Sequence, residues 1–169
     1  MTLSMYQAST PVFRHCLQNL AAILDKAEAY AADKKVDPTV LLQTRLFPDM
    51  FPLVRQVQIV SDGVKGCVAR LAGQQPPSYP DEEKTFAELK ARIAKTIEFI
   101  DSVPASAIDG SEGRAITVQA GPNTLNFTGQ DYLLKFALPN LFFHTTAVYA
   151  ILRTNGVSIG KLDYLGKIG

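Results

Sequence analysis

Apolar residues recur at intervals of three and four residues along four long stretches of this 169-residue chain. That spacing places them on one side of an α-helix, where they can pack against other helices. The four stretches cover residues 4–33, 49–73, 81–103 and 128–154. Four amphipathic helices of this length bury their apolar sides most simply against one another. The sequence therefore predicts an all-α, up-down four-helix bundle as a single domain over residues 1–169.

Capping signals set the expected starts of the first and last helices. Ser4 with Gln7, and Thr128 with Asp131, have the spacing of capping boxes, in which two side chains satisfy the free backbone N–H groups of a helix start. A short additional helix is expected over residues 39–46, because an Asp-Pro pair precedes it.

Acidic residues mark the expected starts of the other two long helices, at Asp49 and Asp81, because negative charge is favoured at a helix N-terminus. Within the third long helix, Glu88 and Arg92 are four residues apart, and we expect them to pair on its solvent-exposed side. In the last helix, Pro139 should remove one backbone hydrogen bond and bend the helix.

A β-hairpin is expected before the last helix. Residues 116–119 and 125–127 alternate between apolar and polar side chains on either side of Gly-Pro-Asn. Since an isolated hairpin is only marginally stable, it should lie on the helices or pair with another chain. Residues 157–169 show no periodicity and are expected to lie against the bundle or to be mobile.

Composition excludes several classes of function. The chain has 17 Lys and Arg against 16 Asp and Glu, a net charge of +1, which argues against nucleic acid as a partner. It has no apolar run long enough to span a membrane, so no membrane partner is expected. No secretory signal is apparent, and Cys16 and Cys67 sit in apolar helical patterns, which favours a reducing, cytoplasmic location.

The last long helix is apolar almost all round. Such a helix is expected to be buried on every side, and in a small domain one route to that burial is contact with a second copy. We therefore expect a homodimer. The apolar positions are Leu133, Leu134, Phe136, Leu138, Leu141, Phe142, Phe143, Val148, Tyr149, Ile151 and Leu152.

The only two histidines of the chain are His15 and His144. His144 follows Asn140 by one turn, on an otherwise apolar stripe, so both polar groups need partners. One interpretation is a metal, ligand or general-base site inside the bundle; the other is a core histidine bonded to a neighbouring group. His15 precedes Asn19 by one turn, and it either faces His144 across the bundle or points to solvent.

The second long helix offers two further candidates. Asp62 could supply a carboxylate to a metal together with His144, or it could pair with Lys65 one turn on. Gln56 lies on the side of this helix that we expect to face inward.

Three segments resemble an uncharacterised bacterial family within the DinB/YfiT-like superfamily of metalloenzymes. They are MYQASTPVFRHCLQNL at the start, DMFPLVRQVQIVSDGVKG in the second long helix, and TGQDYLLKFALPNLFFHTTAVYAILRTNGV at the last helix. The resemblance covers nearly the whole chain. It implies an up-down bundle, a frequent homodimer, and a divalent metal bound by three histidines from the second long helix and an H-x-x-x-H pair on the last.

This chain departs from that ligand pattern. Asn140 stands at the first position of the pair, and if His144 is taken as the first member, the second falls on Val148, which cannot coordinate a metal. The usual metal site is therefore expected to be degraded or replaced, and with it the thiol-transfer and hydrolase activities of the superfamily. In place of a histidine the second long helix offers only Gln56, Gln58 and Asp62.

Two functional hypotheses follow. In the first, a central pocket near His144 holds a small molecule or a divalent metal in a degenerate site. Its candidate ligands are His144, Asn140, Gln56 and Asp62, with His15 on the pocket wall and no residue assigned a catalytic role. In the second, the chain is a non-catalytic homodimeric bundle that binds a small apolar ligand or a partner protein.

Overall fold

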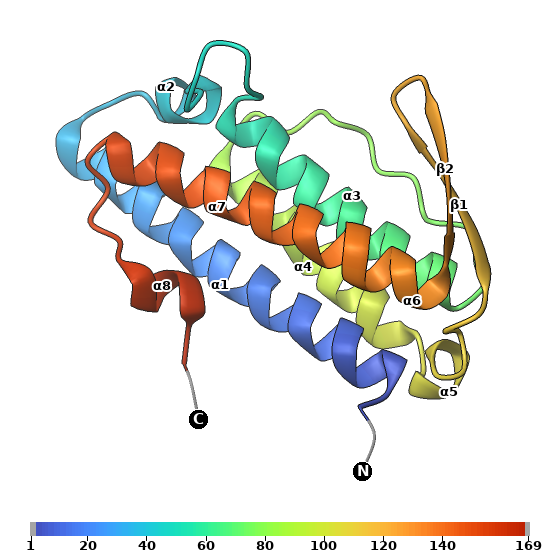
Figure 1. The fold of residues 1–169 in the computed structure, drawn as a ribbon. Coiled ribbons are helices and arrows are strands. Elements are labelled where there is room, and N and C mark those ends of the chain that lie inside the picture. Colours follow the sequence, from blue (N-terminus) through green and yellow to red (C-terminus); the bar gives the residue numbers. More distant parts are fainter. Residues whose placement is uncertain (1–2, 168–169) are drawn as a thin grey trace.

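The computed structural model describes residues 3–167 of the chain. Four long helices lie side by side in a bundle (Figure 1). Helix α3 packs against both α4 and α7, and α1 packs against α4. The predicted four-helix bundle with a hairpin before its last long helix is confirmed. The long helices are α1 (Met5–Lys34), α3 (Leu53–Leu71), α4 (Phe86–Ser102) and α7 (Leu138–Thr154).

Shorter elements join and flank the long helices. They are α2 (Pro38–Gln43), α5 (Ala105–Ile108), β1 (Ala115–Ala120), β2 (Asn123–Thr128), α6 (Gly129–Asp131), a π-helix η1 (Tyr132–Ala137) and α8 (Lys161–Leu165). Helix α8 lies in the predicted aperiodic tail and packs against α1 (Figure 1).

The core forms where the apolar stripes of the long helices meet. The stripe expected on the second long helix is buried, as are the apolar positions of α4 at Leu89, Ile93 and Ile100. Burying each such side chain contributes about 1.5–3 kcal/mol, which is the main force that holds the bundle together. The buried stripe of α3 consists of Val54, Val57, Val60, Val64, Cys67, Val68 and Leu71.

The hairpin packs on the end of the bundle, as one of its two predicted alternatives required. Ile116 pairs with Phe127, and the ring of Phe127 lies 5.8 Å from that of Tyr132 and 5.6 Å from that of Phe136. The opposite face of the hairpin carries polar side chains such as Thr117 and stays exposed.

Three helix boundaries differ from the predicted ones by three residues or more. Helix α2 ends at Gln43 instead of residue 46. Helix α3 begins at Leu53 instead of Asp49, because residues 47–50 form a separate turn and Pro52 is the N-cap. Helix α4 begins at Phe86 because the capping box of Thr85 and Glu88 is a stronger start signal than the acidic residues at 81–83.

A π-helix, η1, directly precedes the turn that contains Pro139, where the sequence predicts a lost backbone hydrogen bond and a bend. The N–H of Leu138 donates to the carbonyl of Leu133, five residues back. Pro139 has no N–H to donate, and in the turns before it the backbone hydrogen bonds span five residues instead of four. Those turns set the direction from which α7 presents Asn140 and His144.

Candidate functional site

His144 and Gln56 meet where α7 packs on α3. The Nδ1 atom of His144 lies 2.6 Å from Oε1 of Gln56, and both side chains are buried, at 8% and 1% exposure. The ring of Phe143 stands edge-on to the imidazole at 5.1 Å. The structure therefore brings together two of the residues that the sequence singled out.

The protonation of His144 follows from the hydrogen bonds of Gln56. The Gln56 amide nitrogen donates to the carbonyl oxygen of Phe51 over 3.0 Å, and a carbonyl can only accept. The amide oxygen must therefore face the imidazole, so Nδ1 carries the hydrogen and donates it. Among residues 3–167, Nε2 has no hydrogen-bond partner, and in this tautomer it bears a lone pair.

Burial lowers the pKa of His144 below its ordinary value of 6.5, and the positive charge of Arg55 lowers it further. Burial acts because a charged imidazolium is poorly solvated inside the protein, and Arg55 acts by repulsion between like charges. The side chain is thus a neutral imidazole near pH 7.

Asn140 lies one turn before His144 and is partly buried. A Cβ atom added at Gly63 would lie 3.5 Å from the Asn140 amide nitrogen, so α3 and α7 approach each other closely there. Gly63 leaves room for the amide but adds no donor or acceptor side chain.

Asp62 points toward α4 instead. Its carboxylate lies 2.5 Å from the Lys65 ammonium and 2.7 Å from the Arg92 guanidinium. The pairing with Lys65 that we weighed from the sequence is therefore present. The contact with Arg92 commits the same carboxylate oxygen to a second cation, on the side of α3 that packs against α4.

Arg92 contradicts its sequence-based placement on the solvent-exposed side of its helix. It is 4% exposed and binds Asp62, Asp81 and Glu83. The residue predicted to pair with it, Glu88, instead caps the start of α4. Arg92 lies three residues after Leu89 and four before Thr96, within the buried stripe, which is the signal that could have revealed its burial.

His15 is exposed and contacts the C-terminal part of the chain, away from His144. Its Nε2 is 2.6 Å from the carbonyl oxygen of Leu165, beside α8. The solvent-facing alternative for His15 is the one found, and the structure does not bring it to His144.

The residues at His144 do not fit a divalent metal. One imidazole nitrogen is available, but the Gln56 oxygen already accepts the Nδ1 hydrogen and Asn140 offers a neutral amide. Divalent transition metals in proteins take imidazole, thiolate and carboxylate ligands. Within residues 3–167 no group of three or more such side chains is placed to hold an ion. No metal-dependent step is derived for this site.

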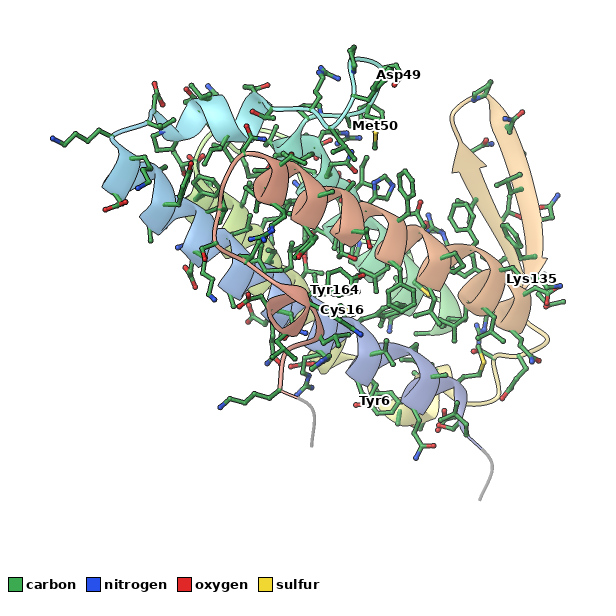
Figure 2. All side chains as sticks on the ribbon, turned by 60° about the vertical axis from the view of Figure 1, so that its left-hand side comes forward. Tyr6, Cys16, Asp49, Met50, Lys135 and Tyr164 are labelled. Atoms are coloured by element: carbon green, nitrogen blue, oxygen red, sulfur yellow. The ribbon has the colours of Figure 1, made fainter. Side chains whose placement is uncertain are left out.

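An apolar groove of about 440 Å³ runs along the outer side of α7. It lies between α7 and the 46–50 segment, whose Asp49 and Met50 are labelled in Figure 2. No sequence pattern indicates that residues 46–50 line a groove. We call these lining residues the α7 face: Leu46, Met50, Pro139, Phe142, Phe143, Thr146, Ala147 and Ala150.

The α7 face contains no charged residue, and several of its apolar side chains are open to solvent. Phe142 is 42% exposed, Phe143 58% and Leu46 41%, and Phe47 and Phe51 beside it are 64% and 54% exposed. The prediction that the last helix is buried on every side is therefore wrong for the single chain. Contiguous exposed apolar surface of this kind marks interaction sites.

Comparison with protein-family models shows the family to which the chain belongs. A family model described as a domain of unknown function, DUF1993, matches residues 5–165. The chain belongs to this DUF1993 family. A solved structure of a DinB family member from Shewanella denitrificans is similar to it, with a TM-score of 0.86 and 43% identity, over 96% of this chain and 92% of that one. The DinB-like resemblance is thereby confirmed.

Two further comparisons bear on the DUF1993 chain. No curated protein matches it. In the part of the chain that the structure describes, no helix is both long enough and apolar enough to cross a lipid bilayer.

The neutral state of His144 predicts how stability depends on pH. Its pKa is lower in the folded chain, so the unfolded chain takes up the proton first. The stability that comes from keeping His144 neutral is therefore complete above about pH 6.5. It is lost as the pH falls through the folded-state pKa, and the free energy of unfolding then falls by at most about 1.4 kcal/mol per pH unit. Urea denaturation from about pH 7 to pH 5 should show a shallower decline for His144→Gln than for wild type.

Exposed His15 supplies the matched control for that measurement. A His15→Gln variant should keep the wild-type decline, because it leaves the buried imidazole in place. Equal slopes for wild type and His144→Gln would contradict the prediction.

Proposed function

We propose that this DUF1993 chain acts as a homodimeric bundle without metal-dependent chemistry, joined through its α7 face. The observation that carries the proposal is the exposed, uncharged groove along α7, in which Phe142 and Phe143 both line the hollow and project from it. A twofold interface uses the same patch on both subunits, so the patch must contain both the projecting and the receiving groups. The α7 face contains both.

The composition of the α7 face favours a protein occupant. Interface cores are enriched in aromatic residues and Met and depleted in charged residues. The α7 face has the aromatic residues Phe142 and Phe143 and the methionine Met50. Asp49, the carboxylate of the 46–50 segment, is not among its lining residues. A second copy presents the same apolar surface and needs no complementary charge.

The expected effect of one substitution tests the dimer. Changing Phe143 to Asp places a charge in the contact, so dimerisation should weaken at least about thirtyfold, the loss of an interface residue worth roughly 2 kcal/mol. Light scattering during size-exclusion chromatography should show a dimer at low micromolar wild type and a monomer for Phe143→Asp.

Leu134→Asp is the matched control for Phe143→Asp. Leu134 is also an exposed apolar residue, at 49%, but it lines a different cavity together with Leu3 and Met5. It should leave the dimer intact. A monomeric wild type, or a Phe143→Asp variant that stays dimeric, would overturn the proposal.

A small apolar ligand is a second candidate occupant, favoured by the groove volume. About 440 Å³ lies within the usual range of ligand pockets, roughly 300–1,000 Å³. Native mass spectrometry of the untagged protein distinguishes the two. A monomer that carries an apolar small molecule would favour the ligand, and a ligand-free dimer would favour the second copy.

A further inference from the structure

Helix α8 is attached to the bundle mainly through polar contacts, to which the ring of Tyr164 adds an aromatic contact with Tyr149. None of its residues is buried, and Leu162 is 74% exposed. In this it differs from the four long helices, each of which buries an apolar stripe. Its docking therefore contributes little apolar burial, so its local opening should cost much less free energy than unfolding of the bundle.

Three contacts hold α8 to α1. The Asn19 amide donates to the carbonyl oxygen of Tyr164 over 3.1 Å, and His15 lies 2.6 Å from the carbonyl oxygen of Leu165. The ammonium of Lys26 lies 2.6 Å from the carboxylate of Asp163. The α1 groups are spread over three turns of that helix, and their partners are the last three residues of α8.

One side chain of α8 also reaches α7. The Tyr164 hydroxyl is 3.1 Å from Oγ1 of Thr145 and 3.3 Å from Oγ1 of Thr146, and its ring meets Tyr149 edge-on. Tyr164 thus bridges the seam between α1 and α7. In Figure 2 its label lies next to that of Cys16, which comes from α1.

A small cavity lies beneath Tyr164 at this seam. It is lined by Cys16, Asn19, Leu20, Ile23 and Thr145 together with Tyr164 itself. Leu20 and Ile23 are each 2% exposed, and burial raises the pKa of the Cys16 thiol. The floor of the cavity is apolar, and Tyr164 is the part of α8 that closes it.

The end of α8 requires glycine. Gly166 has a φ of +71°, in the left-handed region, and an added Cβ would overlap the side chain of Asn19. Both features make any other residue at position 166 unfavourable while α8 is docked. Once α8 is released, the backbone at 166 can change its φ and Asn19 is no longer in contact, so the substitution costs nothing. A substitution there shifts the docking equilibrium without touching the bundle core.

We infer that α8 is a detachable strap that closes the α1–α7 seam, and that it opens as a unit while the four long helices stay folded. Opening removes Tyr164 from the cavity and exposes the apolar floor around Cys16.

The test uses the reactivity of Cys16 toward a thiol-reactive aromatic disulfide, with the full-length protein under native conditions. Cys16 is partly exposed in the closed chain, so its rate has a basal part. Opening adds a second part that is proportional to the open population when closing is faster than reaction. Gly166→Ala should raise the Cys16 rate, and Lys26→Ala should raise it by up to about fivefold, as expected for one exposed ion pair. Cys67, which is fully buried in α3, should stay unreactive.

Lys34→Ala is the matched control, since Lys34 is on the same helix and pairs only with neighbouring Asp33. It should leave the Cys16 rate unchanged, and circular dichroism under native conditions should give wild-type helix content for all three variants, because the four long helices stay folded. Equal Cys16 rates in all the proteins would overturn the inference. So would equal acceleration of Cys16 and Cys67, because the opening would then be global unfolding.

Discussion

Replacing Arg92 with methionine is expected to lower the free energy of unfolding by about 3 kcal/mol. The Arg92 side chain is 2% exposed, and it binds Asp62, Asp81 and Glu83 as well as the carbonyl oxygen of Pro80. A methionine side chain keeps much of the length and many of the apolar contacts of the arginine, so the expected loss of stability comes from the missing charge. The three carboxylates would then lose the cation that they share, while Lys65 still pairs with Asp62 and Arg55 with Asp81.

The size of that effect follows from the exposure of the partners. Breaking a fully buried ion pair costs roughly 3–5 kcal/mol. The side chains of Asp62 and Asp81 are 35% and 39% exposed and that of Glu83 is 13% exposed, so water screens part of the repulsion. The expected loss therefore lies at the low end of that range.

Urea denaturation measures the effect, with both proteins at the same concentration because a dimer gains stability with concentration. Arg14→Met is the matched control. Arg14 pairs with Asp101 at the surface, where the two side chains are 43% and 34% exposed, so its loss should cost less than about 1 kcal/mol. Equal losses in the two variants would contradict a special role for the buried cluster.

The cluster around Arg92 also holds the connection between α3 and α4 in place. Burial alone would raise the pKa of Glu83, but hydrogen bonds from Arg92 and Gln58 lower it instead. A lowered carboxyl pKa stabilises the fold above the ordinary value and loses that contribution as the pH falls through the folded value. The connection is thus fixed by charge, since it supplies few apolar side chains to the core.

Local signals were sufficient to predict most of the fold. Periodicity located the four long helices, and the Ser4 and Thr128 capping signals located the starts of α1 and of α6, which leads through η1 into α7. The acidic residues at 81–83 predict a start of α4 that is too early. In the structure Asp81 and Glu83 bind Arg92, and the capping box of Thr85 begins the helix.

The candidate site was predictable only in part, because its contacts are distant in sequence. The inward side of α3 and the apolar stripe of α7 made Gln56 and His144 candidates for one site, and the structure brings these two side chains together. The orientation of Gln56 depends on the carbonyl of Phe51, which no side-chain pattern encodes. The partner of His15, the carbonyl oxygen of Leu165, lies 150 residues away along the chain.

The exposed aromatic side chains of α7 connect the fold to the proposed dimer. Periodicity counts apolar residues but does not say how many neighbours one chain can supply. Here α3 and the core cover Leu141 and Val148, while Phe142 and Phe143 remain at the surface. This excess of apolar positions over the partners available within one chain is the feature on which the proposed interface rests.

Replacing Gly129 with alanine should also destabilise the fold by about 3 kcal/mol, the upper end of the cost of overpacking. Gly129 is buried at the start of α6, and an added Cβ would overlap the carbonyl oxygen of Ser111 and lie 3.0 Å from its carbon. The obstacle is backbone, which cannot rotate away as a side chain can. Arg114 donates its backbone N–H to that same carbonyl, and Gln130 donates to the carbonyl of Glu112, so the 111–114 loop is tied in place.

Gly113→Ala is the matched control for Gly129→Ala, because Gly113 lies in that loop and an added Cβ would meet nothing within 4 Å. It should change the free energy of unfolding by no more than about 0.5 kcal/mol. The two variants are compared by urea denaturation with equal m-values. If Gly129→Ala matches Gly113→Ala, the 111–114 loop moves freely, and the start of α6 does not depend on it. If it is destabilised as expected, close backbone contact fixes where α6, η1 and then α7 begin, and thereby the direction of the α7 face.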